Sequence, residues 1–187
     1  MDDIKLAFLG FASSGASSYS GGIMVCDTRG FPLEFRYSEP ITPTRVQQVL
    51  YGDVLDKYIK IDVISESLIK SITSPFNLLI VQDEQVLENK FQNKVLVVRI
   101  SLTKSPPLTA QGEYIKIKER EYLVQASSNS NPIRVQFTSA YKIEDEEIKN
   151  TLKILADAGN TMDIDEPLSR VNRALELICQ QNQSKQD

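Results

Sequence analysis

Small residues rich in hydrogen-bond donors gather near the N-terminus, where the run FASSGASSYSGG spans residues 11–22 between two apolar segments. Hydroxyls and backbone N–H groups in a turn can bind an anion. The run has neither the lysine of a phosphate-binding loop nor the G-x-G-x-x-G dinucleotide pattern. Its commoner explanation is a flexible connection between strands, and the alternative is an anion or nucleotide site. The candidate ligand-binding residues are Ser13, Ser14, Gly15, Ser17, Ser18, Gly21 and Gly22.

Histidine is absent from all 187 residues. Its absence excludes Ser-His-Asp and Cys-His catalysis, imidazole-ligated zinc and histidine general bases within this chain. Any chemistry must therefore use carboxylates, lysine, tyrosine, serine or the residues of a partner. A serine nucleophile in the run would need an activating lysine or acid near residues 13–20.

Two groups of acids have spacings that chemistry could use. Residues 163–166 read D-x-D-E, which could hold a hard cation through oxygen atoms, but the spacing does not match an EF-hand loop. Asp53 and Asp56 could pair as an acid and a base. Helix capping explains the D-x-D-E group better, and a solvent-exposed face or a cap explains Asp53 and Asp56 as well. The sequence therefore predicts no catalytic residue, no metal site and no cofactor.

A mixed basic and aromatic set follows the first strands. Arginine and tyrosine are enriched at protein interfaces and also stack on nucleic acid bases. The formal net charge of −4 and the pI near 5.0 disfavour nucleic acid. We therefore expect a protein partner or a homo-oligomer. The candidate interface residues are Arg36, Tyr37, Arg45, Tyr51, Lys57 and Tyr58.

The cysteines and the N-terminus indicate the compartment. Cys26 and Cys179 belong to no C-x-x-C pair and have no metal-ligand spacing, so we expect reduced, buried thiols. The chain opens with acids where a signal peptide needs a positive segment. No apolar run approaches the ~20 residues that span a bilayer. We expect a cytoplasmic protein with no membrane insertion.

Strand patterns occupy the first third and the middle of the chain. The apolar run 4–11 predicts a buried strand, and residues 23–37 predict a hairpin that turns at Asp27–Gly30. Pro32 early in the second hairpin strand indicates an edge position or the start of the strand. Apolar residues at 31, 33, 35 and 37 predict that this strand has one buried and one solvated face. Further strands are predicted at 78–81 and 95–100 and in a meander over 114–137.

Helical patterns fill the remaining segments. Residues 42–72 carry an apolar stripe from Val46 to Ile72, with a break at Gly52. Two C-terminal helices separated by Gly159 predict a helical hairpin. The fold class expected is α+β, with an antiparallel or mixed β-sheet covered by a central helix region and a C-terminal helical hairpin. Residues 1–180 form a single domain in this prediction, and 181–187 a disordered tail.

The segment TRGFPLEF, residues 28–35, resembles the glycine-turn hairpin of roadblock and longin-type domains. That resemblance implies a sheet that carries helices and serves as an assembly platform. With the exclusions above, we expect a non-enzymatic adaptor or accessory subunit of an intracellular multi-protein assembly. One alternative is a small-molecule or nucleotide-binding sensor that uses residues 11–22. The other is a histidine-free enzyme that uses serine or carboxylate chemistry.

Overall fold

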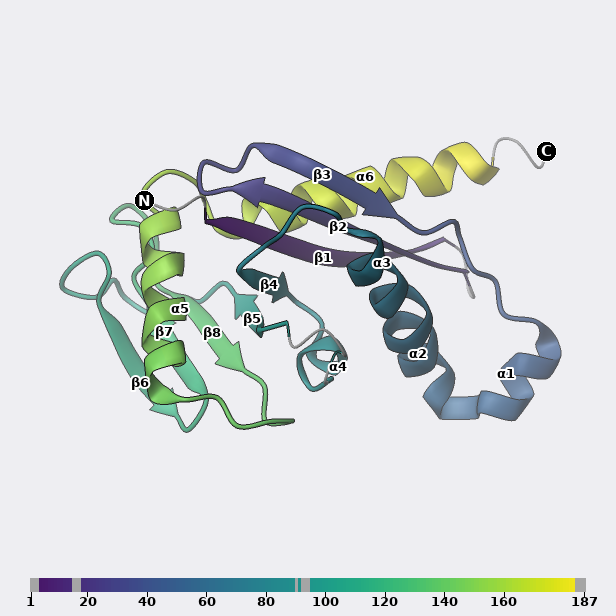
Figure 1. The fold of residues 1–187 in the computed structure, drawn as a ribbon, viewed down its shortest axis with the longest axis horizontal. Coiled ribbons are helices and arrows are strands. Elements are labelled where there is room, and N and C mark those ends of the chain that lie inside the picture. The colour runs from purple at the N-terminus through teal and green to yellow at the C-terminus, as the bar shows by residue number, and fades with distance from the viewer. Residues whose placement is uncertain (1–3, 15–17, 90, 92–94, 184–187) are drawn as a thin grey trace.

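A computed structural model describes residues 4–14, 18–89, 91 and 95–183. The fold is built on one eight-stranded mixed sheet (Figure 1). The strands are β1 (Lys5–Ser14), β2 (Ser18–Asp27), β3 (Pro32–Tyr37), β4 (Leu78–Val81), β5 (Val97–Ser101), β6 (Tyr114–Lys118), β7 (Glu121–Val124) and β8 (Ile133–Phe137). Their order in the sheet is β3-β2-β1-β4-β5-β8-β7-β6.

The helices include a broken central region and two longer C-terminal helices. The central region comprises α1 (Arg45–Tyr51), the 3₁₀ turn η1 (Gly52–Val54), α2 (Leu55–Tyr58), the π-helix η2 (Ile59–Ser65) and α3 (Glu66–Ser71). A single turn, α4 (Glu84–Leu87), follows β4. The C-terminal pair is α5 (Asp145–Ala158) and α6 (Glu166–Gln183). The predicted α+β class with a mixed sheet is therefore confirmed.

The parallel strands lie at the centre of the sheet. β1 pairs with β4 in parallel, with Leu9 opposite Val81, and β4 pairs with β5 in parallel. The remaining pairings are antiparallel. The carboxyl ends of β1 and β4 therefore meet at the same edge of the sheet, where the chain can place side chains from both strands around one site.

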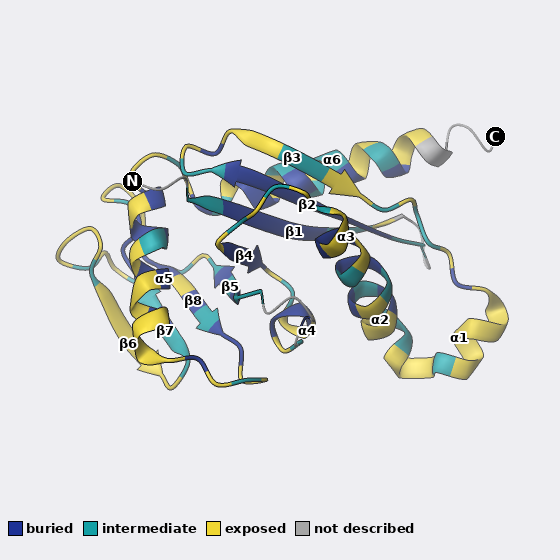
Figure 2. Cartoon of the chain, viewed as in Figure 1, coloured by how far each residue is buried: buried dark blue, intermediate teal, exposed yellow. Residues whose placement is uncertain are grey.

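Helices cover both faces of the sheet. Side chains of a strand alternate between faces, so Leu6 and Phe8 of β1 pack into the cluster that also contains residues of α5 and α6. Ala7 and Leu9 pack on the opposite face with residues of η2, α3 and α4. β1 is buried on both faces because it lies between these two layers (Figure 2).

The first hairpin forms as predicted, but the burial predicted for the apolar face of its second strand is not observed. Gly30 has a positive φ of 78°, and β3 is an edge strand. The predicted burial of its apolar face is wrong, because Phe31, Leu33 and Tyr37 are 61%, 48% and 48% exposed. β3 is contacted on both sides, since Phe35 packs against the core and Glu34 accepts hydrogen bonds from the segment after α3.

Glu34 gives the fold a testable dependence on acid. Hydrogen bonds from the backbone N–H groups of Ser74 and Thr73 to its carboxylate lower the pKa of Glu34 from 4.5 to about 2. A depressed carboxyl pKa stabilises the fold above pH 4.5, and this contribution is lost as the pH falls toward 2. Glu34→Gln should reduce the loss of stability over this window in urea titrations. Glu176→Gln, on the exposed surface of α6, should retain the wild-type pH profile.

The predicted apolar stripe of the central helices is only half buried. Thr44 caps α1 through a capping box with Gln47, yet none of the α1 residues is buried. Val49 and Leu50 are 80% and 76% exposed, so the prediction that they face the core is wrong. α1 projects away from the sheet (Figure 2). Burial begins at Ile59, where the helix reaches the sheet.

The C-terminal helices and the thiols largely follow the sequence. α5 ends at Ala158 with Gly159 as its C-cap, and α6 packs on β1 and β2. α6 continues through Gln183, into the segment 181–187 predicted to be a disordered tail, and residues 184–187 lie outside the described residues. Cys26 and Cys179 are free and buried, as predicted, and burial raises the pKa of Cys26 to about 12. None of the helices in the described part of the chain is long and apolar enough to cross a membrane.

Candidate functional site

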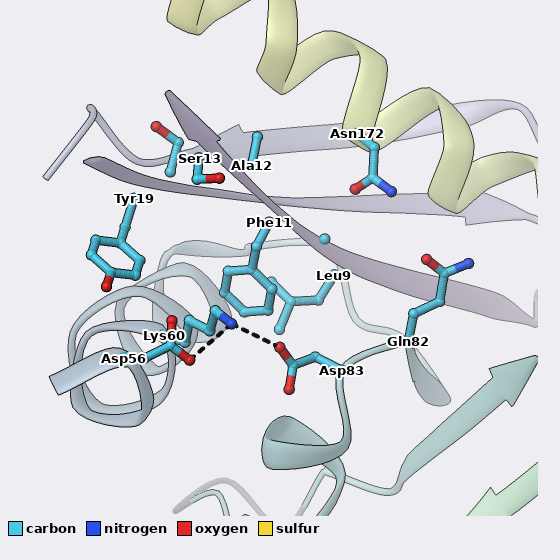
Figure 3. A pocket seen from close by; sticks show the side chains of 12 residues that line it. Leu9, Phe11, Ala12, Ser13, Tyr19, Asp56, Lys60, Gln82, Asp83 and Asn172 are labelled. Atoms are coloured by element: carbon cyan, nitrogen blue, oxygen red, sulfur yellow. Dashed lines mark hydrogen bonds and ion pairs between the residues drawn. The ribbon is translucent and has the colours of Figure 1, made fainter. Parts of the chain in front are cut away.

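A cavity of about 390 Å³ lies at the carboxyl ends of β1 and β4 (Figure 3). β1 lines it with residues 9–13, and the two residues that follow β4 line the opposite side. Open α/β sheets place ligands at this position because the carboxyl ends of neighbouring strands diverge there. The remaining lining residues come from β2, the central helices and α6: Tyr19, Ser20, Asp56, Lys60 and Asn172.

An ion cluster centred on Lys60 crosses the mouth of the cavity. The Lys60 Nζ lies 3.0 Å from Oδ2 of Asp56 and 3.3 Å from Oδ2 of Asp83. Burial lowers the pKa of Lys60, but the hydrogen bond to Asp56 and the two negative charges outweigh it, so the net shift is upward. Lys60 is therefore a protonated cation at neutral pH. It cannot serve as a general base there, because it holds no free lone pair.

The backbone holds both ends of this cluster in place. Lys60 lies in the π-helix η2, where the Ser65 hydroxyl donates to the Lys60 carbonyl at 2.6 Å. π-helical turns are rare and occur often at functional sites. Asp83 is the N-cap of α4, and its Oδ1 accepts a hydrogen bond from the Gln85 N–H at 2.8 Å. Asp83 therefore caps a helix with one oxygen and binds Lys60 with the other.

On the α6 side, the cavity is shaped by the close approach of Gly10 and Asn172. A Cβ atom at Gly10 would lie 2.4 Å from Oδ1 of Asn172, so Asn172 occupies the space of a missing side chain on β1. Asn172 Oδ1 is buried and has no hydrogen-bond partner among the described residues. An unpaired buried acceptor is costly, and a ligand with an N–H or O–H group would satisfy it.

Two aromatic rings complete the wall. Figure 3 shows the rings of Phe11 and Tyr19 pointing from the strands toward Asp56 and Lys60. An aromatic ring offers a flat stacking surface, and the carboxylate and amide oxygens offer hydrogen-bond acceptors. The cavity therefore suits a flat, neutral or cationic ligand that carries hydrogen-bond donors at its edge.

The cavity does not suit a two-metal hydrolytic centre. Two-metal hydrolysis needs carboxylates that are open to the metal ions. Within the described residues, no three His, Cys, Asp or Glu side chains come together to hold a metal ion. Asp56 and Asp83 are both bound to Lys60, and β1 carries glycine at position 10. The residues present do not fit such a centre.

Cavities of larger volume lie elsewhere in the described part of the chain. One of about 620 Å³ lies between the turn at Asp27 and α5, but Asp27 is already paired with Arg29 at 2.8 Å. Another of about 500 Å³ lies near the start of β4, away from the carboxyl ends of the parallel strands. Neither combines aromatic rings, an ion cluster and an unpaired buried acceptor.

The described residues of the predicted ligand-binding run are strands rather than a loop. Residues 11–14 and 18–22 belong to β1 and β2, which pair in register from Lys5 opposite Asp27 to Ser14 opposite Ser18. Small residues are needed there for packing, since a Cβ atom at Gly21 would lie 2.3 Å from Ile64 Cγ2. Of the predicted ligand residues, Ser13 lines the cavity, while Ser18, Gly21 and Gly22 do not. The backbone of Ser14 ends β1, and Gly15 and Ser17 lie outside the described residues.

The predicted interface residues fall on three elements, β3, α1 and α2. Tyr51 and Tyr58 stack with ring centroids 4.6 Å apart on the central helices, which also carry Arg45 and Lys57. Arg36 and Tyr37 lie on β3, where Arg36 pairs with Glu34 at 3.0 Å and Tyr37 stacks on Phe35 at 5.9 Å.

The acids of the D-x-D-E pattern are bound to neighbouring groups. Asp165 accepts a hydrogen bond from the Gln82 side chain at 3.0 Å, which ties the end of β4 to the segment before α6. Glu166 pairs with Arg170 at 2.8 Å. Asp53 lies in η1. Asp56 binds Lys60 rather than forming the predicted acid–base pair with Asp53.

Sequence reasoning missed most of the cavity. Tyr19, Lys60, Gln82, Asp83 and Asn172 were not singled out. Asp83 had a usable signal, because it follows the apolar run LLIV and carboxyl ends of buried strands carry ligand-binding residues. Lys60 and Asn172 had none, since each is one polar residue in a helical pattern.

The chain resembles known proteins in its structure but not in its sequence. No protein-family model matches the sequence, and no curated protein matches it. Among solved structures, Ciona intestinalis endonuclease V (D234N), in complex with DNA containing an inosine followed by a ribo-adenosine, is 8% identical with a TM-score of 0.57. The match covers 96% of this chain and 87% of that one.

Two further solved structures share the fold. Human endonuclease V is 7% identical with a TM-score of 0.53, over 96% of this chain and 86% of that chain. A. aeolicus Argonaute is 11% identical with a TM-score of 0.54, over 92% of this chain and 28% of that chain. At these identities the likeness establishes the fold.

The shared fold overturns three expectations. The prediction of a non-enzymatic adaptor or accessory subunit is wrong, because the structures that share the fold across their length are endonucleases. The expectation that nucleic acid is disfavoured as a partner is also wrong, because one of these structures holds DNA. The resemblance of residues 28–35 to roadblock and longin-type hairpins is a local one, and it does not support an assembly platform.

Proposed function

We propose that this chain binds nucleic acid and that the cavity between β1 and β4 holds one base of the bound strand. The observation that supports the proposal is the position of this cavity, with its aromatic rings and unpaired acceptor, at the strand edge of a fold shared with a DNA-bound endonuclease V. Ser13, at the end of the cavity, is the one predicted ligand-binding residue that the proposal retains.

The charges of the cavity favour a base over a phosphate. One ammonium, Lys60, faces two carboxylates, Asp56 and Asp83, so the excess charge is negative and repels a phosphate. The amino and imino N–H groups of a base can donate to Asn172 Oδ1 and to the carboxylates. Stacking on the ring of Tyr19 then contributes about 1–3 kcal/mol per base.

A base-centred site also resolves the conflict with the acidic composition. Nucleic acid binding that neutralises many phosphates needs a basic surface, which a chain of net charge −4 does not provide. Stacking and edge recognition need no excess of positive charge. We therefore expect a shallow dependence of affinity on salt, with a slope of about −0.7 for each phosphate contacted on a single strand.

Fluorescence anisotropy with labelled single-stranded DNA, single-stranded RNA and duplex DNA tests the proposal. Tyr19→Leu keeps the apolar bulk of the side chain but removes the stacking face, so it should weaken single-strand binding roughly 5- to 150-fold. Free nucleosides should compete with the strand, whereas inorganic phosphate should not, because the cavity recognises the base.

Tyr114→Leu is the matched control, because Tyr114 is 42% exposed on β6 at the opposite end of the sheet. It should bind the strand as the wild type does. Absence of binding to all three nucleic acids, at protein concentrations up to about 10⁻⁴ M, would refute the proposal. Equal loss of affinity in both variants would show that the base lies elsewhere.

We also propose a cytoplasmic location, supported by the two free, buried thiols. The single-domain organisation stays a proposal as well, supported by one sheet that unites strands from β1 to β8. Fractionation of cells that express the chain at native levels would test the location. Limited proteolysis that released a stable fragment ending within 102–113, between β5 and β6, would contradict the single domain.

A further inference from the structure

We propose that Lys60 is the resident cation of this cavity, taking the place that a divalent metal ion would otherwise fill between Asp56 and Asp83. The fold is shared with nucleases, whose chemistry commonly uses divalent cations, yet the described residues form no group that would hold one. The ammonium of Lys60 instead joins the two carboxylates. Ligand binding at the cavity is then independent of metal ions.

The distances fit an ammonium rather than a metal. The two carboxylate oxygens lie 3.0 and 3.3 Å from Nζ of Lys60, which are distances of charge-assisted hydrogen bonds. Mg²⁺ would require oxygens at about 2.0–2.1 Å in octahedral geometry. Both carboxylates would have to move inward by about 1 Å to hold Mg²⁺ at the same point.

At Asp83 that movement has a cost. Its second oxygen caps α4 through the Gln85 N–H at 2.8 Å, so a shift toward a metal would weaken the cap. Lys60 is held from the other side, because the Ser65 hydroxyl binds its carbonyl at 2.6 Å. Both partners are therefore positioned for an ammonium–carboxylate pair.

The opposite wall excludes a further carboxylate from β1. Any side chain at Gly10 would begin 2.4 Å from Oδ1 of Asn172, so an acid cannot stand there while Asn172 keeps its place. α6 supplies no third carboxylate either, since the residue with which it lines the cavity, Asn172, carries an amide. The cavity thus lacks the third carboxylate and has a cation between the other two.

Thermal denaturation of the whole chain with and without MnCl₂ or MgCl₂ tests the inference, with NaCl at matched ionic strength as the salt control. The wild-type melting temperature should not respond to the divalent ions. Lys60→Met leaves two uncompensated carboxylates, so it should melt at a lower temperature. Mn²⁺ at ten times its dissociation constant should then raise the melting temperature of this variant by about 3–5 °C.

Two further variants sharpen the result. Lys60→Met combined with Asp83→Asn should lose the response to Mn²⁺, because one of the two carboxylates has become neutral. Lys57→Met, which removes an exposed lysine of α2, should behave as the wild type does. A wild-type protein stabilised by Mn²⁺ through Asp83 would overturn the inference, and so would a folded Lys60→Met variant that does not respond. If Lys60→Met does not fold, the melting temperatures of the wild type and of the single variant Asp83→Asn, each with and without Mn²⁺, decide the question. Stabilisation of the wild type by Mn²⁺ that is lost in Asp83→Asn would overturn the inference, and the absence of any response in the wild type would support it.

The independence of nucleic acid binding from metal rests on the proposed function, whereas the melting experiment does not. EDTA should leave the anisotropy titration with single-stranded DNA unchanged. If no nucleic acid binds, the proposed function fails while the melting data still test the role of Lys60. If the strand binds only with Mn²⁺ present, the role assigned to Lys60 fails while the proposed function stands.

Discussion

Phe8→Ala is expected to lower the free energy of unfolding by about 3–5 kcal/mol, because it removes a large ring from a site that cannot collapse around the gap. Phe8 is 0% exposed and lies on β1, between β2 and β4. Its ring packs against the layer formed by α5 and α6. Urea denaturation followed by circular dichroism measures the loss, and the variant should also lose nucleic acid binding, since β1 forms one wall of the cavity.

Phe31→Ala provides the control for this substitution. The same ring is removed, but Phe31 is 61% exposed just before the edge strand β3. Its ring therefore buries little apolar area in the folded protein, and its removal costs little. Its free energy of unfolding should change by less than about 0.5 kcal/mol. A similar loss in both variants would show that Phe8 is not part of the buried cluster between β1 and the C-terminal helices.

Gly159→Ala should also destabilise the fold strongly, by about 3 kcal/mol, the upper end of the usual cost of overpacking. The backbone at Gly159 has an ordinary φ of −63°, where alanine would normally stabilise a protein by about 0.4–1 kcal/mol. Here the substitution should destabilise the protein instead, because the added Cβ would lie 2.2 Å from the carbonyl oxygen of Ala126. That carbonyl also accepts a hydrogen bond from the Gln111 side chain at 2.9 Å, so it cannot move away without cost.

Gly112→Ala separates backbone strain from packing. Gly112 has a φ of 83° and no atom within 4 Å of an added Cβ, so its cost is the left-handed conformation alone, about 1–2 kcal/mol. Urea denaturation should therefore rank Gly159→Ala as the more destabilising variant. The reverse ranking would mean that α5 and β7 do not approach as closely as the structure shows.

The strands were predictable where local pattern and final burial agree. The run LLIV at 78–81 forms a strand because a short continuous apolar segment suits a position covered on both faces. The turn at Gly30 was predictable because only a residue without a Cβ takes its φ of 78° without strain. The apolar alternation in β3 misled, because alternation shows that two faces differ but not which face meets a neighbouring element.

The cavity was far less predictable because it combines residues distant in the chain. Asp83 follows β4, Lys60 lies in the central helices and Asn172 comes from α6. Each is locally an ordinary polar residue, and only the parallel pairing of β1 with β4 brings the three elements together. The run at 11–22 drew attention for its composition, yet its small residues mainly allow close packing within β1 and β2.

By itself, the sequence determined the elements and some exclusions. Apolar periodicity set the strands and the C-terminal helices, and the absence of histidine removed imidazole chemistry, because these properties depend only on residue type and spacing along the chain. The tertiary structure alone decided which polar groups meet. An ion pair such as Lys60 with Asp83 depends on distances across the fold, and a chain written in one dimension contains no such distance.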